Sequence, residues 1–365
     1  MPSYISSIGT AVPSHRISQS EIGEFMLRHL PLSEQEQRTL RLLYRASGIQ
    51  YRHSVIGDFS KQPEGFTFFP PSPDLEPFPK VSQRMAKYEE EAIKLCEYAV
   101  KDCMQGRNLS GITHLITVSC TGMYAPGLDI QLVEQLGLNT STQRTAINFM
   151  GCYASFNALK VADQIVKNDS TAKVLVVSVE LCSLHVLKKT DEDSLLSNAL
   201  FGDGAAAVLI EGKSTGTQLE IAATYADLAL SGKNEMAWHI NDFGFEMKLS
   251  VEVPEVIQQG IGTLTQRLLA KLDLQLEDVD YFGIHPGGKR ILEVIESELH
   301  LTKDQNQPAY EVLKNYGNMS SPTVLFVIKY LMDGFEEEDD GKNLLSFAFG
   351  PGLTLESMLF KIHTQ

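Results

Sequence analysis

The sequence lacks the features of a secreted or membrane-spanning protein. Nowhere do eighteen apolar residues follow one another, and the first residues contain no long apolar segment of the secretory type. Cysteine is scarce, because the 365 residues contain five, placed singly without a CxxC pair or a Cys/His cluster at zinc spacing. We therefore expect no disulfide framework, no metal site and no membrane span, and a cytoplasmic protein.

An excess of basic charge is also lacking. Lysine and arginine number 31 against 46 acidic residues, so the formal net charge of −15 argues against general nucleic-acid binding, which needs a basic surface. An anionic substrate must then meet a local basic cluster. The acidic run at 336–340 is flanked by glycines and is predicted to be a solvated loop. At 43% hydrophobic residues, the composition is that of a globular protein with a large core or two similar subdomains.

Short apolar runs alternate with helical patterns along the chain. The runs are mostly continuous, as in strands covered on both faces, and lie at 113–119, 173–179, 205–210, 280–285 and 343–349. Helical patterns are clear at 82–103 and 155–168. The sequence therefore predicts an α/β protein with layered sheets. The proline-rich segment 57–80 is predicted to be a long loop.

Residues 111–138 and 276–301 resemble two copies of one unit. Each has a polar or acidic start, a strand, a glycine-containing turn, a helix and a closing leucine. The similarity is weak, and two such units also resemble each other by chance. A duplication would bring two strand-end turns to one shared site.

Three residues lie in turns that suit chemistry, although each alone is more often structural. Cys152 in NFMGCYAS precedes a helical run, and free cysteines are usually small buried hydrophobes. His285 in FGIHPGGKR ends a buried strand, where ligand sites of α/β folds tend to lie. Asn318 in NYGNMSSP stands in a glycine turn before an apolar helix at 322–332.

Together these three residues indicate acyl-thioester condensation. A thiol that opens a helix has its pKa lowered by the helix dipole and by a nearby imidazolium, so we expect a thiolate at Cys152. Cysteine forms thioesters that are readily attacked. A histidine and an asparagine amide are suitable donors for the oxygen of a thioester enolate, which must be stabilised in such a reaction.

Five blocks of the sequence resemble those of the type III polyketide synthases, the chalcone synthase-like family, in the family's order. They are GCYAS, ALFGDGAAAVLI, FGIHPGGKRIL, NYGNMSSPTVLF and FAFGPGLTLE. The resemblance covers nearly the whole chain, least in the proline-rich segment. It implies a homodimer with a thiolase-like layered αβαβα fold from two duplicated halves. Residues 1–215 would carry Cys152, and residues 216–365 would carry His285 and Asn318.

The resemblance also implies an activity. This is the iterative decarboxylative Claisen condensation of malonyl-CoA onto an acyl starter held on Cys152, followed by cyclisation, without a metal or redox cofactor. The backbone N–H of Cys152 would contribute to an oxyanion site. His285 and Asn318 would polarise the malonyl thioester and stabilise the enolate left by loss of carbon dioxide. His285 would also keep Cys152 ionised.

Further residues match positions that line the substrate cavity in this family. Phe201 and Met247 match its two gatekeepers. Trp238 stands where the family commonly has glycine, so we expect a smaller cavity that favours a lactone or a short chain. Ala125, before a peptide bond predicted to be cis, matches the residue that reaches into the partner subunit's cavity. The other matching positions are Cys120, Cys182, His185, Ser320, Gly350, Pro351 and Gly352.

The cations that hold coenzyme A in the family do not match in register. Their positions are occupied by Thr39, Leu42 and Ala46. We expect the neighbouring Arg41 and Arg45, with Lys289 and Arg290 after the HPGG turn, to supply the charge. Delivery of the starter by an acyl carrier protein stays open.

Other classes of protein remain as alternatives. A ketoacyl synthase III, which performs a single condensation of the fatty-acid type, shares the Cys-His-Asn set but resembles GCYAS and NYGNMSSP less well. A papain-like hydrolase has the same order of residues, but its CGSCW-like block, signal peptide and disulfide pairing are missing. A non-catalytic scaffold of the same fold is disfavoured by the intact set. The starter, the number of extensions and the type of ring are left open.

Overall fold

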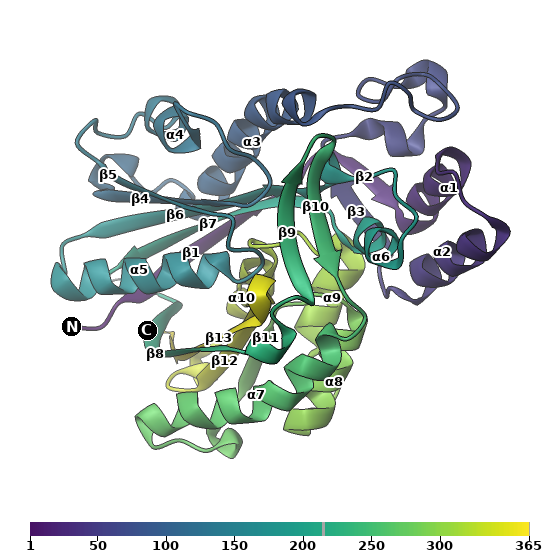
Figure 1. Cartoon of the computed structure of the whole chain (residues 1–365). Coiled ribbons are helices and arrows are strands. Elements are labelled where there is room, and N and C mark those ends of the chain that lie inside the picture. The colour runs from purple at the N-terminus through teal and green to yellow at the C-terminus, as the bar shows by residue number, and fades with distance from the viewer. Residues whose placement is uncertain (214–215, 365) are drawn as a thin grey trace.

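One sheet runs through the protein, and its strand order repeats about its centre (Figure 1). In the computed structural model, which describes residues 1–213 and 216–364, the order is β11-β12-β13-β8-β1-β7-β6-β4-β5. The first half contains β1 (Tyr4–Ala11), β4 (His114–Ser119), β5 (Gln143–Asn148), β6 (Lys173–Leu181) and β7 (Asp203–Glu211). The second half contains β8 (Gln218–Leu228), β11 (Tyr281–Ile284), β12 (Asn343–Gly350) and β13 (Thr354–His363).

The directions of strand pairing repeat as well. β1 and β7 are antiparallel, as are β8 and β13. The next pairs outward, β7 with β6 and β13 with β12, are antiparallel, and the pairs β6 with β4 and β12 with β11 are parallel. β4 and β11 therefore hold equivalent positions, and they are the strands of the two similar units. The predicted division at 215/216 falls at residues outside the described part of the chain and stays a prediction.

Two helices lie between the halves of the sheet. α5 (Ala154–Asn168) contacts β4 and β6 of the first half and β13 of the second. α10 (Thr323–Met332) contacts β11 and β12 of the second half and β1 and β7 of the first. The sequence of α10, TVLFVIKYLM, is apolar on nearly every side, and a helix of this kind is stable only when it is covered all round.

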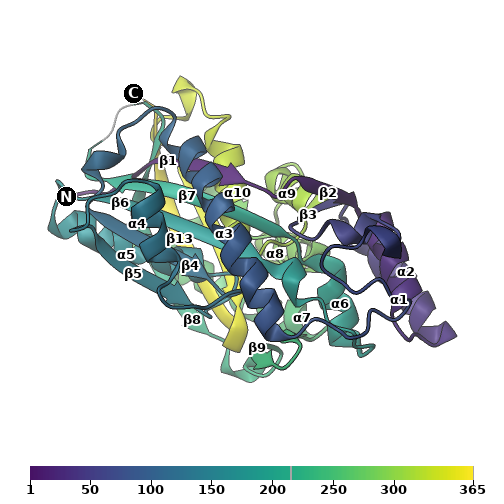
Figure 2. The ribbon, with the colours of Figure 1, turned by 90° about the horizontal axis from the view of Figure 1, so that it is seen from above.

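Helices also cover the two outer faces of the sheet. α3 (Val81–Met104) packs on β1, β7 and β6, and α7 (Val253–Leu269) packs on β8 and β13. α8 (Lys289–Leu299) packs on α7. Figure 1 shows these layers from α3 at the top to α7 at the bottom, and Figure 2 shows α3 lying across the strands. With the two halves of the sheet counted as separate layers, the predicted order of helix, sheet, helix, sheet and helix is confirmed.

A lobe of short elements stands beside the first half (Figure 1). It contains β2 (His15–Ser18), α1 (Gln19–His29), α2 (Glu34–Ala46) and β3 (Tyr51–Ser54). Capping boxes begin both helices, with Ser18 and Glu21 at α1 and Ser33 and Glu36 at α2. The remaining elements are α4 (Leu128–Gln135), α6 (Glu192–Leu200), β9 (Met236–Asn241), β10 (Gly244–Leu249) and α9 (Gln307–Tyr316).

The proline-rich segment 57–80 is the predicted loop, with short 3-10 turns at Gly57–Ser60 and Pro63–Gly65. Buried Asp58 organises it by accepting hydrogen bonds from the backbone N–H groups of residues 67, 68 and 69. The acidic run at 336–340 is exposed as predicted except at Asp339, which is buried and accepts hydrogen bonds from Tyr281 and Lys342. In the described ranges, no helix is long and apolar enough to cross a membrane.

Candidate active site

Cys152 lies in the turn that leads from β5 into α5. The backbone reverses at Phe149 and Gly151, whose φ values of 61° and 82° are positive. Glycine is needed at 151, because a Cβ there would lie 2.2 Å from Cδ of Pro351. Gly151 also donates its N–H to Sγ of Cys120 at 3.0 Å. The turn is thus held from two sides, and Cys152 stands two residues before the first residue of α5.

The structure brings Cys152, His285 and Asn318 to one small pocket. The Cys152 thiol points at Oδ1 of Asn318, with 3.9 Å between sulfur and oxygen. Nδ2 of Asn318 donates to the carbonyl of Gly287 at 3.2 Å, in the turn that follows His285. His285 comes directly after β11, and Asn318 comes from the turn before α10. The two halves of the sheet therefore contribute to one site.

The backbone of Asn318 is fixed by the segment that contains Phe201. Asn318 donates its N–H to the carbonyl of Leu200 at 3.0 Å, and Gly202 donates its N–H to the carbonyl of Asn318 at 2.9 Å. Buried Arg52 donates to the carbonyl of Phe201 at 2.6 Å. These bonds set the position of the Asn318 side chain relative to the pocket.

His285 is 1% exposed, and neither ring nitrogen has a hydrogen-bond partner among the described residues. Burial lowers the pKa of its imidazole to about 3, so the ring is neutral at ordinary pH. A buried polar group without a partner costs free energy, and such groups are kept where a ligand supplies the partner. The neutral ring offers one N–H donor and one acceptor nitrogen to a molecule in the pocket.

The expectation that Cys152 is a thiolate is not met in this structure. Burial raises the pKa of its thiol to about 12, which outweighs the lowering by hydrogen bonds with Ser320 and Asn318, and the charge of Glu180 raises it further. Desolvation is thus the largest influence on the pKa of this thiol. The imidazole of His285 is neutral too, so it places no standing positive charge beside the thiol.

Sequence analysis missed a buried carboxylate behind the nucleophile. Oε2 of Glu180 accepts hydrogen bonds from the backbone N–H of Cys120 at 2.9 Å and from Thr121 Oγ1 at 2.8 Å, and Oε1 accepts one from Ser321 Oγ at 2.5 Å. Glu180 thereby joins the end of β4, the end of β6 and the turn before α10. The sequence does mark Glu180 as the one acidic residue in an otherwise apolar strand. A carboxylate buried in such a strand needs hydrogen-bond partners nearby.

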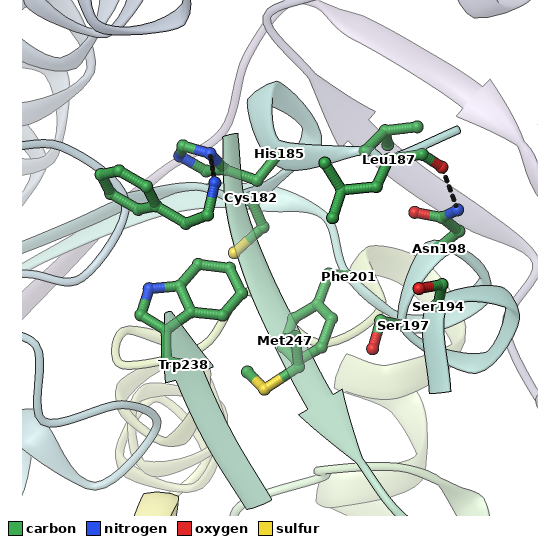
Figure 3. A pocket seen from close by; sticks show the side chains of 11 residues that line it. Cys182, His185, Leu187, Ser194, Ser197, Asn198, Phe201, Trp238 and Met247 are labelled. Atoms are coloured by element: carbon green, nitrogen blue, oxygen red, sulfur yellow. Dashed lines mark hydrogen bonds between the residues drawn. The ribbon is translucent and has the colours of Figure 1, made fainter. Parts of the chain in front are cut away.

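Phe201 and Met247 stand between the Cys152 pocket and a second pocket, since both residues line both. Figure 3 shows the second pocket, with Cys182, His185 and Trp238 on one side and α6 on the other. Met247 pairs with Trp238 across the β9–β10 hairpin. The structure therefore brings together the predicted gatekeepers and three of the predicted cavity residues.

Trp238 forms a fixed wall of this second pocket. Its Nε1 donates to the carbonyl of Cys120 at 2.8 Å, and its ring lies edge-on to His185 and Phe245, with centroids 5.8 and 6.0 Å away. His185 is held between the carbonyl of Thr121 at 2.7 Å and the N–H of Phe245 at 2.9 Å. The indole is thus oriented by one hydrogen bond and two ring contacts, and it cannot turn away without breaking the hydrogen bond.

Other predicted cavity residues surround the turn of the nucleophile. Ser320 is buried beside Cys152, with a positive φ of 58°. Gly350 is required by packing, because a Cβ there would lie 2.5 Å from the ring of Tyr153. Pro351 packs on Gly151, and Gly352 continues the same turn. Cys120 is buried behind the turn and supports it.

The predicted cis peptide bond between Ala125 and Pro126 is confirmed. Ala125 is exposed on this chain and lies apart from the pockets around Cys152. Its role across a twofold axis stays a prediction.

The four predicted cations lie on different sides of α2. Lys289 and Arg290, at the start of α8, line a third pocket. It shares Leu249, Gly287 and Ile291 with the Cys152 pocket, and we call it the entrance pocket. Arg41 and Arg45 line a separate groove between α1 and α2. Successive helical residues turn by about 100°, so these two arginines lie on the flank of α2 opposite the entrance. The structure therefore brings Lys289 and Arg290, but not Arg41 and Arg45, to the pocket next to that of Cys152.

Comparison with known proteins agrees with this arrangement. Residues 2–214 match the family model for the N-terminal domain of chalcone and stilbene synthases, and residues 220–363 match the model for the C-terminal domain. The chain is 29% identical to the alpha-pyrone synthesis polyketide synthase-like Pks18 of Mycobacterium tuberculosis, over 98% of this chain and 91% of that protein. It is 29% identical to type III polyketide synthase A of Arabidopsis thaliana, over 98% and 92%.

Solved structures show the same fold. PKS-I from the brown alga Ectocarpus siliculosus superposes with a TM-score of 0.92 at 30% identity, over 99% of this chain and 98% of that chain. The C-terminal type III polyketide synthase domain of Steely1 from Dictyostelium, described as a type I/III hybrid, gives 0.90 at 28% identity, over 99% of both chains.

The fold therefore places the protein among the thiolase-like enzymes. Within that class, the chain belongs to the chalcone and stilbene synthase family of type III polyketide synthases, and the protein is an acyltransferase.

Proposed function

We propose that the protein extends an acyl starter on Cys152 with units from malonyl-CoA by repeated decarboxylative Claisen condensation, and then closes the chain to a lactone. The observation that carries this proposal is the pocket in which the Cys152 thiol and the Asn318 amide meet an imidazole with two unpaired nitrogens. A nucleophile, a proton acceptor and donors for a developing oxyanion are the parts that such a reaction needs.

In the loading step, Sγ of Cys152 attacks the carbonyl carbon of the starter thioester while the neutral ring of His285 accepts the thiol proton. The transfer forms thiolate and imidazolium as a pair during the attack, so that neither charge is buried alone, which burial disfavours for both groups. The proton then goes to the departing thiol of the carrier. The starter is left as a thioester on Cys152.

In the extension step, the bond between the malonyl α-carbon and its carboxylate breaks, and its electron pair forms an enolate. The enolate oxygen accepts hydrogen bonds from the His285 ring N–H and from Nδ2 of Asn318. The enolate carbon attacks the thioester carbonyl carbon on Cys152, the carbon–sulfur bond breaks, and the released Sγ takes up a proton from water. Return of the lengthened chain to Cys152, with release of the carrier thiol, permits another round. Attack by the chain's own enol oxygen on the thioester carbonyl forms the lactone, breaks the carbon–sulfur bond and passes the enol proton to the departing thiol.

All five cysteines are free, as is typical of proteins in a reducing compartment. This fits a cytoplasmic enzyme, which we propose meets its substrates there. The proposal is tested by incubating the protein with malonyl-CoA and a panel of acyl- and aroyl-CoA starters and identifying the products by mass. Products with two or more added units and the mass of a lactone support the proposal. Products that stop after one linear addition would instead identify a single condensation of the ketoacyl synthase III type.

We also propose a homodimer formed along the β5 edge of the sheet. β5 pairs on one side with β4, and its residues are largely exposed. Met123 and Ile130, each 43% exposed, lie on either side of Ala125 and Pro126. An apolar patch beside a free strand edge is typical of a subunit interface. Sedimentation at micromolar concentration is expected to give twice the 40.5 kDa of the chain, and a mass of one chain would contradict this proposal.

Replacing Trp238 with glycine is expected to lengthen the product or to change its ring. A tryptophan side chain buries roughly 150–250 Å², and here it forms the wall beside Met247, so its removal opens room for a chain to fold back on itself. Trp238→Phe, which keeps most of the bulk, is the control, and melting temperatures of both variants monitor folding. Identical product masses and ring types for the glycine variant and the wild type would show that this side chain does not limit the product.

A further inference from the structure

Helix α2 lies between two grooves that have different chemistry. On one flank, Leu43 and Ser47 line the entrance pocket that leads to Cys152. On the other flank, Arg41 and Arg45 line the groove against α1. The two grooves have no lining residue in common, and the exposed crest of the helix separates them. Any partner that contacts both must span the whole width of α2, about 10 Å.

The arginine flank is unusual in this acidic chain. The net charge is −15, yet the stretch 37–53 contains no aspartate or glutamate. The side chain of Arg38 is 74% exposed and meets Glu34 at 3.9 Å. Arg41 and Arg45 are exposed, and neither forms an ion pair among the described residues. Glu24 lies in the same groove. The flank therefore keeps unpaired positive charge at the surface.

The crest between the grooves is apolar. Leu42, 67% exposed, stands on the outward face of α2, and Val251, 59% exposed, lines the entrance before α7. Large exposed apolar side chains close to unpaired cations are typical of protein-binding surfaces. Free coenzyme A at the entrance would meet uncharged side chains on this face of α2, because the arginines point to the opposite flank.

Positive charge continues across the entrance. Lys289 packs against the chain just after α2, since a Cβ on Gly48 would lie 3.4 Å from Cδ of Lys289. Its side chain is 47% exposed, and that of Arg290 is 72% exposed. Glu293 neutralises part of this charge, at 3.8 Å from Lys289 and 3.5 Å from Arg290. The entrance therefore carries positive charge on its α8 side, whereas the arginines of α2 lie on the far side of the apolar crest.

We propose that this surface docks an acidic acyl carrier protein, which delivers the starter through the entrance as a thioester on its phosphopantetheine arm. The inference rests on the proposed function and adds the source of the starter. An acidic helix of the carrier would lie across α2 and cover Leu42, with its carboxylates at Arg41 and Arg45. A footprint of this width covers both grooves and the crest between them.

The test uses the acyl group that condenses best in the CoA panel, presented to the purified enzyme either on coenzyme A or on an acyl carrier protein from the same organism. In Arg41→Glu/Arg45→Glu, the KM for the acyl carrier protein is expected to rise roughly tenfold or more, because like charges now face each other. The KM for the same acyl group on coenzyme A is expected to stay within twofold, roughly the range of substitutions remote from a ligand. Added salt should weaken the carrier reaction more than the CoA reaction.

The matched control is Lys101→Glu/Lys303→Glu, which makes the same change of net charge at exposed sites away from α2. It is expected to leave both KM values within about twofold of the wild type. Equal use of both thioesters by the wild type, or an equal effect of the arginine changes on both, would overturn the docking proposal while leaving the condensation in place. Lack of condensation with every starter on either carrier would instead refute the proposed function.

Discussion

Cys152→Ala is expected to abolish chain extension, with a fall of about 10³-fold or more in the rate of product formation. No other cysteine in the described chain lies in a turn that opens a helix beside His285 and Asn318. Without Sγ the starter has no covalent site, so the enolate of malonyl-CoA meets no acceptor thioester. The measurement is product formation from malonyl-CoA and the best starter, together with mass spectrometry of acyl adducts on the intact protein.

Two variants sharpen this prediction. Cys96→Ala removes another fully buried thiol, in α3, and is expected to keep both the adduct and the product. Cys152→Gln imitates the acylated residue and is expected to release carbon dioxide from malonyl-CoA while making no extended product. Sustained extension by the alanine variant would refute the assignment of the nucleophile.

His285→Ala is expected to slow the decarboxylation of malonyl-CoA by about 10²- to 10³-fold, the usual effect of removing one oxyanion donor. The reason is that the ring N–H, unpaired in the pocket, is available to the enolate oxygen. His285→Gln keeps a neutral donor and should recover part of the loss. Release of carbon dioxide from malonyl-CoA, measured without a starter, isolates this step. Equal rates for the alanine variant and the wild type would contradict the assigned role.

The burial of this ring also predicts a pH dependence of stability. The pKa of His285 falls from an ordinary value of 6.5 to about 3 in the folded protein, so only the unfolded chain binds the proton between these values. Stability attributable to this residue is therefore constant above pH 6.5 and decreases as the pH falls toward 3. The free energy of unfolding, measured by chemical denaturation across this range, should fall less with decreasing pH in His285→Gln than in the wild type. Because the ring of His285 stays neutral between pH 6 and 8, titration of this residue should cause no change of slope in the pH profile of the decarboxylation rate in that range.

Sequence patterns predicted five strands of the large sheet. β4, β6, β7, β11 and β12 are continuous apolar runs, and each was predicted to within two residues. β5 was not, because its sequence QRTAIN has no apolar run and is a strand through its pairing with β4. β9 and β10 were also missed, since they depend on each other in a separate two-stranded sheet.

Prediction of which residues meet in the structure succeeded where local turn chemistry marks a residue and failed where distant segments decide. Cys152, His285 and Asn318 each stand in a glycine-rich turn, and the structure brings them together. The expected ionisation of Cys152 is not met, because burial, which depends on the packing of both halves, raises the pKa of the thiol. Glu180 was missed because its hydrogen-bond partners come from two other segments of the chain.

The separate hairpin formed by β9 and β10 has an evolutionary consequence. It lies between β8 and α7 in the chain and takes no part in the repeated sheet, yet it carries Trp238 and Met247. Substitutions at these two positions would reshape the second pocket while Cys152, His285 and Asn318, which come from other segments of the chain, stay as they are. Selection can therefore act on the walls of that pocket through one short hairpin, separately from the residues that meet at the thiol.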